Sequence, residues 1–523
     1  MSYKRLLLLL FLLSGTFVTE ASADSWDRDN FPPNHTDVRL TETNLPIVFI
    51  DTRDSDHARP TVIHKDYRVA VRMKIIHNPA SLNYADTLAH PGQRIDYEGW
   101  VGIKYRGSSS FTYSEKKPYS FKTLASGDVE GKKRNVGLLG MPKDNDWVML
   151  APYHDRSCMR DVLMYELARP YFEFTPKARY CELMLDGIYY GIYILLEKAG
   201  KGANRLDLVS PGDMADELTG DYLLQVDRDD APCFLSTYAS YGKNNFVQYK
   251  FPKYGEMDGI HPEQLDYIEQ QYHAMEEAFR GDDFTDPETG YRKYADVMSF
   301  ANYQLASELS MNVDAYRLST YLYKRRDSTD PRFKTTLWDF NLAFGNNYAD
   351  RLMQDRWFTD AFELWSWLQQ TTVPFYWKRI MEDPAYMVTM KEQWARCRME
   401  NYSHEHVNRV IDSLNYELTS HDAIARNFAA WPNRQKAVYP VPNIAQTHEG
   451  EVEFLRDFVQ KRTRWMDSQL GFDLHTVIPE APASGKAGTQ TYYNLRGERT
   501  DAPRRGLYIV RFPDGTTRRQ AVR

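Results

Sequence analysis

The sequence predicts an α+β fold with a β-rich front and a mainly helical back, arranged as two lobes around a cleft. Short runs of β-branched and aromatic residues dominate the first third of the chain, whereas apolar residues beyond His261 recur mostly at helical spacing. The composition is that of a globular protein, with 42% hydrophobic, 14% aromatic and 26% charged residues among 523. A chain of this length accommodates roughly two to four domains.

The N-terminus is typical of a secretory signal. Lys4 and Arg5 precede an apolar stretch, residues 6–18, and Ala21-Ser22-Ala23 offers a small-residue cleavage site. The apolar stretch is too short to span a bilayer. We therefore expect a signal peptide at residues 1–23, no transmembrane segment, and an exported mature chain that is periplasmic, on the cell surface or extracellular.

The expected strands lie in the first two hundred residues. Four of them are Pro46–Asp51, Val69–Ile76, Trp100–Tyr105 and Tyr119–Leu124. Two further runs, Arg179–Leu185 and Tyr189–Leu196, flank the turn Asp186-Gly187 and predict a β-hairpin.

Helical spacing begins at residues 156–168, where Met159, Leu163 and Leu167 predict a helix that ends before Pro170. The helical region after His261 is interrupted by Tyr316–Lys324 and Thr335–Asp339, which we expect to be extended. We place the β-rich lobe at residues 24–225 and the mainly helical lobe at residues 226–478.

Residues 479–523 form a separate compositional unit. A stretch rich in Pro, Ala, Gly and Ser opens it, and the whole segment carries nine basic and four acidic residues. Its Tyr-rich and β-branched runs predict a small β tail, either a sorting module or an appendage on the helical lobe.

Several chemistries are excluded or disfavoured. The net charge of −7 and the pI of about 6.0 argue against nucleic-acid binding. The four cysteines form no C-x-x-C pair, which disfavours structural zinc. The acidic runs 51–56 and 227–230 lack the spacing of a calcium loop, and we expect both to be solvated turns.

A candidate phosphate-binding region follows the third expected strand. The small-residue turn Arg106–Ser110 exposes backbone N–H groups that are suited to phosphate oxygens. Lys122, near the end of the next strand, offers an ammonium for the same phosphates. The alternative is a polar hairpin with surface lysines.

Two lone carboxylates stand at the edges of later strands. Asp314 precedes Ser319 by five residues, and Asp339 lies in the run 338–345 among apolar and aromatic neighbours. An aspartate that accepts a hydroxyl proton, followed by one that binds Mg²⁺ ahead of a Phe, is the order used in kinase-like phosphoryl transfer. Capping or ion-paired aspartates are the alternative.

These segments together resemble the CotH family, the spore-coat-protein-H-like atypical kinases. The similarity covers roughly residues 45–470 in order. It is carried by the segments 106–122, 145–160, 191–198, 220–227, Asn312–Asp314 and 338–345. The resemblance implies a divergent, two-lobed protein-kinase-like fold that binds ATP and Mg²⁺ and phosphorylates secreted or surface proteins.

The resemblance also implies residue roles. Lys122 matches the phosphate-contacting lysine, Asp314 the catalytic aspartate and Asp339 the metal-binding aspartate. Glu166 is expected to orient Lys122, and Glu197 falls where a linker between the lobes would contact adenine.

Two positions depart from the family pattern. Ser319 stands where kinases place a metal-binding Asn, and Asn341 stands where many members have a second Asp. Both retain an oxygen, but Asn341 removes a negative charge from the expected Mg²⁺ site. We therefore expect an ATP-dependent transferase acting on Ser or Thr hydroxyls. The alternative is a non-catalytic surface protein, a pseudokinase, that binds carbohydrate or a protein partner.

Overall fold

The computed structural model describes most of the chain. The described residues are 30–53, 61–240, 242–255, 259–347, 355–359, 372–436, 438–442, 444–473, 491–493, 499–500, 506–511 and 517–522. The expected signal peptide and residues 479–490 of the expected linker lie outside them. The chain divides into two compact units, Met1–Trp465 and Met466–Arg523.

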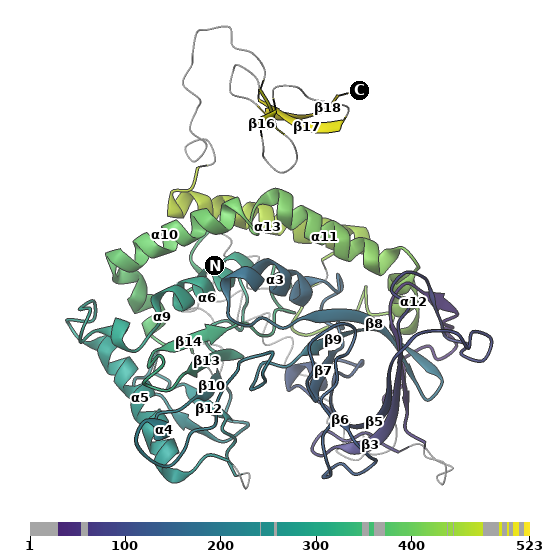
Figure 1. Ribbon diagram of the computed structural model, residues 1–523, viewed down its shortest axis with the longest axis horizontal. Coiled ribbons are helices and arrows are strands. Elements are labelled where there is room, and N and C mark those ends of the chain that lie inside the picture. Colours follow the sequence, from purple (N-terminus) through teal and green to yellow (C-terminus); the bar gives the residue numbers. More distant parts are fainter. Residues whose placement is uncertain are drawn as a thin grey trace, which may run out of the picture. The chain divides into compact units, whose positions relative to one another are not determined.

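Seven strands of the described chain close into a β-barrel in the first unit (Figure 1). They are β2 (Ile47–Asp51), β3 (Val69–Ile76), β5 (Ile95–Tyr105), β6 (Tyr119–Leu124), β7 (Asp146–Leu150), β8 (Ala178–Leu185) and β9 (Ile188–Glu197). Neighbouring strands are antiparallel, except that β2 pairs parallel with β8 and so closes the barrel.

The barrel interior is packed with aromatic rings. The ring centroids of Tyr119 and Tyr193 lie 5.7 Å apart, and those of Tyr105 and Tyr119 lie 5.2 Å apart. Because β6 and β9 are not neighbours, the Tyr119–Tyr193 contact crosses the interior. All three side chains are buried, which fits a barrel too narrow to hold anything but its own side chains.

The predicted hairpin is confirmed as β8 and β9. Its two turn residues, Asp186 and Gly187, have φ of 51° and 85°. Positive φ at both central residues is the requirement of a type I′ turn, which Asp-Gly meets at low cost. The predicted bounds of the strands at 69–76 and 119–124 agree with β3 and β6.

A second sheet of five described strands follows. Its order is β11 (Cys233–Leu235), β12 (Phe246–Phe251), β10 (Tyr222–Asp227), β13 (Thr320–Lys324) and β14 (Phe333–Thr336), all antiparallel. The expected division at residues 225 and 226 falls inside β10, whose partners β12 and β13 belong to this sheet. The extended runs predicted at 316–324 and 335–339 are shortened because Ser319 and Asp339 have positive φ, of 50° and 65°.

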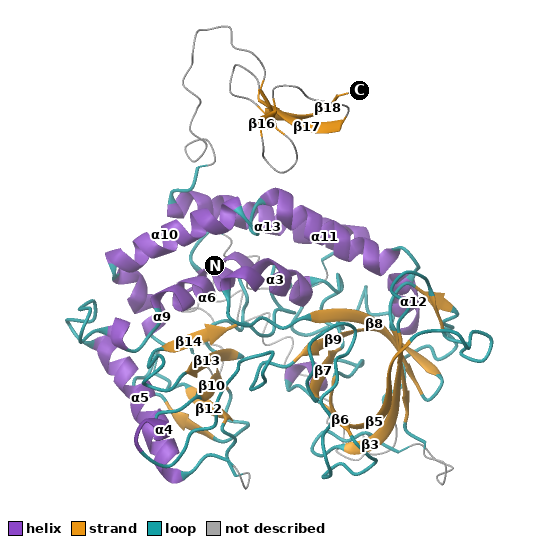
Figure 2. Ribbon diagram, in the orientation of Figure 1, coloured by secondary structure: helices purple, strands orange, loops and turns teal. Residues whose placement is uncertain are grey.

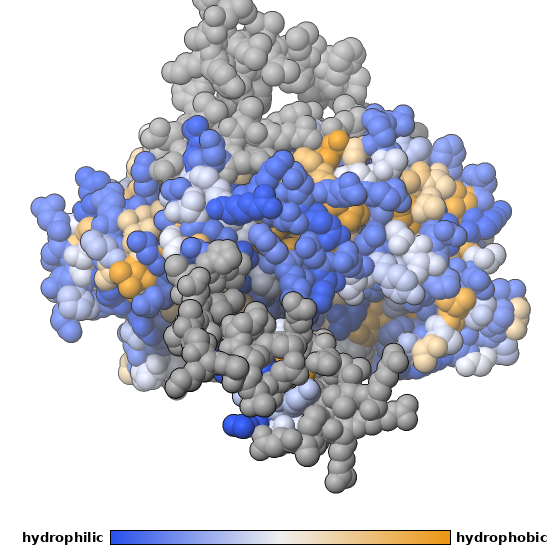
Figure 3. All heavy atoms as spheres, turned by 90° about the horizontal axis from the view of Figure 1, so that it is seen from above, coloured by the Kyte–Doolittle hydropathy of each residue, from blue (hydrophilic) through white to orange (hydrophobic). Residues whose placement is uncertain are grey.

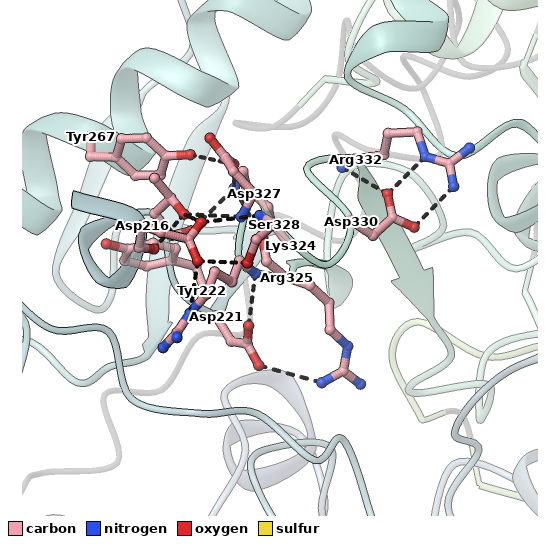
Figure 4. Close-up of polar contacts among 12 residues, drawn as sticks. Asp216, Asp221, Tyr222, Tyr267, Lys324, Arg325, Asp327, Ser328, Asp330 and Arg332 are labelled. Atoms are coloured by element: carbon pink, nitrogen blue, oxygen red, sulfur yellow. Dashed lines mark hydrogen bonds and ion pairs between the residues drawn. The ribbon is translucent and has the colours of Figure 1, made fainter.

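One end of this sheet carries a dense polar cluster (Figure 4). Lys324, whose side chain has no exposed surface, donates from Nζ to Asp327 Oδ1 (2.5 Å) and to the carbonyl oxygen of Thr219 (3.1 Å). Arg325 Nη1 lies 3.3 Å from Asp221 Oδ2. Neighbouring contacts of the same kind are Arg326–Asp216, Arg332–Asp330 and Ser328–Asp216.

The helices of the described chain lie mainly in its second half. They are α2 (Ser109–Thr112), α3 (Arg160–Ala168), α4 (Ala215–Leu218), α5 (Pro262–Arg280), α6 (Val297–Ser310), α9 (Tyr376–Arg379), α10 (Pro384–Met399), α11 (His404–Thr419), α12 (Ala423–Ala430) and α13 (His448–Leu470). Side chains of Asp296, Asp383 and Ser403 cap the N-termini of α6, α10 and α11. Short 3₁₀ turns occupy Arg169–Tyr171, Tyr291–Lys293 and Ile380–Glu382.

Helix α3 is shorter than predicted. It begins at Arg160 rather than at Arg156, because Cys158 has a φ of 61° that a right-handed helix does not accommodate. Asp155 organises the residues ahead of the helix. Its Oδ1 accepts hydrogen bonds from the backbone N–H (3.0 Å) and Oγ (2.6 Å) of Ser157, and its Oδ2 accepts one from the Arg160 backbone N–H (2.8 Å).

The later helices cover the strands (Figures 1 and 2). Helix α12 packs on β9, α11 on α3, and α10 on α6. Helix α13 is fixed to α6 by Arg462, whose Nη2 lies 3.0 Å from Glu308 Oε2, with both side chains fully buried. The mixed α+β content is thereby confirmed. The closed barrel is a feature that the sequence does not predict.

The second unit contains a small antiparallel sheet of β15 (Thr491–Tyr493), β16 (Arg499–Thr500), β17 (Gly506–Arg511) and β18 (Thr517–Val522). In the first unit, β1 (Glu42–Thr43) pairs with β4 (Asn83–Tyr84). The face of the molecule shown in Figure 3 is mostly hydrophilic, with apolar residues in separate patches. Among the described helices none combines the length and the apolar character needed to cross a membrane.

Candidate functional site

The candidate site lies at the end of the five-stranded sheet opposite the Lys324 cluster. Strand β10 ends at Asp227, Ser319 immediately precedes β13, and Asp339 follows β14 by three residues. The antiparallel register pairs Val226 with Thr320 and Tyr321 with Thr336. This register brings the end of β10, the start of β13 and the end of β14 to one edge of the sheet.

Ser319 joins the two carboxylates at this edge. Its backbone N–H donates to Asp227 Oδ2 (3.2 Å), and its Oγ donates to Asp339 Oδ2 (3.4 Å). Ser319 and Asp339 both hold positive φ, which costs a non-glycine residue conformational energy. Such strain persists only where the surroundings impose it, and it is concentrated at functional sites.

Asn312 ties Asp339 to Asp314. Its Nδ2 donates to the Asp339 carbonyl oxygen (2.8 Å), and its Oδ1 accepts from the Asp314 backbone N–H (3.2 Å). The Asp314 carboxylate accepts a hydrogen bond from Arg317 Nη2 (3.1 Å). The two aspartates expected from the sequence therefore lie in one hydrogen-bonded loop system, together with Ser319.

The carboxylates interact electrostatically. Burial raises the pKa of Asp339, and the negative charges of Asp314 and Asp227 raise it further, whereas Arg106 opposes the increase. Burial likewise raises the pKa of Asp227. Among the described residues, ion pairs engage Asp227 and Asp314 but not Asp339.

A further buried carboxyl belongs to helix α3. Asp161 Oδ1 accepts a hydrogen bond from the Phe340 backbone N–H (2.6 Å), and Tyr165, one turn along, accepts one at its hydroxyl from the Asp339 N–H (3.1 Å). Burial raises the pKa of Asp161, as does the nearby charge of Asp339. Two side chains of helix α3 thus fix the backbone N–H groups of Asp339 and Phe340.

Gly345 closes the segment that begins at Trp338. Its φ is 75°, and a Cβ at this position would lie 2.7 Å from the ring of Phe454 and 2.8 Å from that of Phe458, both on α13. Glycine is therefore required both by the backbone conformation and by the close approach of α13.

Arg106, predicted to face phosphates, lies at the site. Its guanidinium stacks over the Trp338 ring at 5.3 Å, and its charge lowers the pKa of Asp339. The barrel therefore contributes a cation beside the sheet edge.

Lys122 belongs to a basic cluster on the barrel. Its strand partner is Asp146 on β7. Burial lowers the pKa of Lys122, and Asp146 is the strongest charge acting against that decrease. Asp146 also accepts a hydrogen bond from Lys198 (3.0 Å) and lies 3.8 Å from Arg68. Lys250 on β12 interacts electrostatically with both the basic cluster and the carboxylates. Asp227 raises the pKa of Lys250, whereas Lys198 and Arg106 lower it.

The structure gives Glu166 different surroundings from those expected. Its Oε1 lies 2.7 Å from Arg169 Nη2, and its side chain lines a surface cavity of about 580 Å³ between α3, β8 and α11. The acidic partner of Lys122 is Asp146, on the neighbouring strand. Val162 and Glu166 of α3 line the cavity. Asp161 and Tyr165, each one residue earlier and therefore about 100° around the helix, contact the backbone of Phe340 and Asp339.

Glu197 lies at the end of β9, where it is bonded to Lys177. It is buried, its Oε2 accepts from the Lys177 backbone N–H (3.0 Å), and its own N–H donates to the Lys177 carbonyl (3.1 Å). Both contacts hold the end of the barrel together and leave the Glu197 backbone N–H engaged. The contact of Glu197 with adenine stays a prediction.

The contact that Asn341 makes near the site comes from its backbone carbonyl. Its carbonyl oxygen accepts a hydrogen bond from Asn346 Nδ2 (2.7 Å), which shapes the loop after Asp339. No described contact joins its side chain to the Asp339 carboxylate. Of the two predicted neighbours of the metal-binding aspartate, Ser319 alone touches it among the described residues.

Four polar residues at or near the site were not predicted as site residues: Asp227, Asn312, Asp161 and Asp146. The side chain of Asp227 is 13% exposed, which contradicts the expected solvated turn at its position. The available signal was that Asp227 ends an apolar run, as a residue at a strand end does. The others take their roles from tertiary packing, which their sequence neighbours do not reveal.

The arrangement suits phosphate chemistry. Mg²⁺ takes hard oxygen ligands and is usually held by one or two carboxylates together with substrate phosphates. Asp339 with the Ser319 hydroxyl supplies such oxygens, and basic side chains of the barrel lie nearby. Within the described residues no three His, Cys, Asp or Glu side chains gather closely enough to hold a metal ion by themselves.

Comparison with known proteins identifies one family. The sequence model described as CotH kinase protein matches residues 103–466, a span that contains every residue of the site described above. A search of curated protein sequences gives no significant match.

Proposed function

The chain belongs to the CotH kinase family, and from this premise we propose that it is an ATP-dependent, Mg²⁺-requiring phosphotransferase that phosphorylates Ser or Thr hydroxyls of a protein. The observation that carries the proposal is the contact of Ser319 with both Asp227 and Asp339, next to Asp314. Carboxylates held this close without a full set of cation partners repel one another, and a bound ion with phosphates relieves that repulsion.

Each residue has a role in this proposal. Asp339 and Ser319 hold Mg²⁺, which when bound neutralises charge on the phosphates. Arg106 and Lys122 contact phosphate oxygens. Asp314 orients the acceptor hydroxyl and accepts its proton as the oxygen attacks the γ-phosphorus and the bond to the β-phosphate oxygen breaks. Positioning and charge neutralisation supply most of the rate enhancement.

The place of action is part of the proposal. The signal-like residues 1–23 support export, and therefore an acceptor among secreted or surface proteins.

A non-catalytic role is the second candidate. The observation that favours it is that Asn341 supplies no charge where many family members have a second Asp, and that Ser319 replaces the metal-binding Asn. Under this reading the protein binds a carbohydrate or protein partner, and ATP with Mg²⁺ leaves its melting temperature unchanged.

Calorimetric titration of ATP in the presence of Mg²⁺ tests the proposal. We expect binding by the wild-type protein, an accompanying rise in melting temperature, and loss of both in Asp339→Asn. Asp282→Asn, at an exposed position after α5, is the matched control and should bind as the wild type does. Equal ATP affinity in Asp339→Asn and wild type would remove Asp339 from the metal site.

A further inference from the structure

Asp227 ends strand β10 where the predicted metal ligands meet. Its Oδ2 accepts a hydrogen bond from the Ser319 backbone N–H, and the Ser319 hydroxyl reaches Asp339. A single residue therefore spaces the two carboxylates and presents its own hydroxyl between them. This arrangement places three oxygen-bearing groups, from three different segments, at one point of the sheet edge.

We propose that Asp227 is the second carboxylate that holds the divalent cation, opposite Asp339 and with the Ser319 hydroxyl between them. The inference rests on the proposed function, because the cation is the one that accompanies the nucleotide. Asp227 then supplies from β10 the negative charge that Asn341 lacks.

Gln225 gives independent support. It lies two residues before Asp227 on the same face of β10, and its Nε2 donates to Asp227 Oδ2. The side chain is 5% exposed, and its Oε1 is buried with no hydrogen-bond partner. A buried amide oxygen without a partner is costly, and a cation or its coordinated water is the kind of group that would remove this cost.

The charges around Asp227 leave a place for a cation. Arg228 Nη1 is 3.7 Å from Asp227 Oδ1, and 36% of the Arg228 side chain is exposed, so this pair is long and open to solvent. Lys250 acts on Asp227 as well, but its hydrogen bond goes to Gln248 (2.8 Å). Arg228 and Arg106 also act electrostatically on Asp339, but neither forms an ion pair with it among the described residues. Among those residues, Ser319 is the one that hydrogen-bonds to both carboxylates.

The number of ligands makes the site dependent on the nucleotide. Two carboxylates and a hydroxyl are too few for the octahedral coordination of Mg²⁺ without phosphate oxygens and water. We therefore expect metal and nucleotide to bind together, each strengthening the other by the same factor.

The test measures that coupling. The affinity of a non-hydrolysable ATP analogue is determined calorimetrically in Mg²⁺ and again in EDTA, and the ratio of the two dissociation constants is the metal dependence. We expect Asp227→Asn to reduce this ratio at least about tenfold. Asp229→Asn makes the same charge change two residues later at an exposed position and should keep the wild-type ratio.

A melting curve in EDTA separates this role from a structural one. Asn at position 227 still accepts a hydrogen bond from Ser319 and removes repulsion toward Asp339, so the metal-free variant should melt at or above the wild-type temperature. A lower melting temperature with an unchanged ratio would overturn the inference. Asp227→Ser, which removes the charge with a shorter uncharged side chain, provides the same comparison if the Asn variant does not fold.

Different results would contradict the proposed function and the inference about Asp227. If the wild-type protein binds no nucleotide with or without Mg²⁺, the proposed function is wrong and the inference falls with it. If the wild type shows metal-dependent binding and Asp227→Asn shows the same ratio, the inference alone is wrong.

Discussion

Aspartates gather at both ends of strand β13, but only at one end does each of them have a close cation partner. At the Ser319 end this holds for Asp314, which pairs with Arg317 at 3.1 Å, but not for Asp339 or Asp227. At the Lys324 end, Asp327, Asp221 and Asp330 each meet a basic side chain within 3.3 Å (Figure 4). At the Ser319 end, Asp339 has no ion pair among the described residues, and Asp227 has only the 3.7 Å contact with Arg228. The first arrangement stabilises the fold by itself, whereas the second, under the proposed function, becomes favourable when a bound ligand supplies positive charge.

The two acidic clusters of this sheet differ in the direction in which their surroundings shift the aspartate pKa values. Side-chain contacts lower the pKa of Asp330, although burial works against them. Burial and neighbouring carboxylates raise the pKa of Asp339. The same residue type therefore has opposite shifts at the two ends, and variants at each end are expected to change different properties.

The largest effect is expected at Asp314. Asp314→Asn keeps the shape and the hydrogen bond from Arg317 but removes the base, so phosphate transfer to any acceptor should fall about 10²–10⁴-fold, roughly 3–5 kcal/mol of barrier. ATP affinity should stay near the wild-type value. Radiolabel transfer and melting temperature are measured on one preparation. A folded variant that transfers phosphate at the wild-type rate would exclude Asp314 from the mechanism.

The next effect is on stability, at the opposite end of β13. Lys324→Met removes the donor to the Thr219 and Arg325 carbonyls, and one of the donors to the Asp327 carboxylate, which keeps its hydrogen bond from Tyr267. The free energy of unfolding should fall by about 1–3 kcal/mol. Urea denaturation measures this loss, and calorimetry should show unchanged ATP affinity in the folded variant. Lost affinity at unchanged stability would contradict the division between the two ends.

The pH dependence of the metal-free protein provides a third test. Because the pKa values of Asp161 and Asp339 are raised, the native state binds more protons than the unfolded chain above the ordinary aspartate pKa of about 4. The free energy of unfolding should therefore decrease as the pH rises through the raised values, by up to about 1.4 kcal/mol per pH unit for each proton. In EDTA, Asp161→Asn should flatten this slope. An equal slope in wild type and Asp161→Asn would contradict the raised pKa.

The smallest effect is expected for Asp327→Asn. The Asp327 side chain is 44% exposed, so solvent screens its pair with Lys324. The loss of stability should be at most about 1 kcal/mol, with the pH slope and ATP affinity of the wild type. Thermal denaturation at two salt concentrations checks this, since high salt should reduce the difference between variant and wild type.

Local patterns explain which parts of the fold were predictable. Runs of β-branched and aromatic residues located β3 and β6 with their observed bounds, and Asp186-Gly187 located the hairpin turn. Closure of the barrel depends on the parallel pairing of β2 with β8, strands separated by more than a hundred residues. No local pattern records such a pairing.

The same limit applies to the site. Asp314, Ser319 and Asp339 lie in short segments whose order and spacing carry chemical meaning, and the structure brings them together. Glu166 was expected near Lys122, but in α3 it pairs with Arg169 and lines the surface cavity, about a quarter of a turn from the face that contacts Asp339. Asp227 was missed because its partner Ser319 lies 92 residues away.

That separation has a consequence for how the protein matures. The contact between Asp227 and Ser319 forms only after β10 and β13 have paired, and between them the chain runs through β11, β12, α5 and α6. Pairings this distant are slow, because the entropy of closing a long loop is lost before the contact forms. A chain that is still folding therefore lacks the contact that brings Asp227, Ser319 and Asp339 together. Under the proposed function, nucleotide binding should therefore appear as one of the last steps of folding, and an incompletely folded molecule should not transfer phosphate to its neighbours.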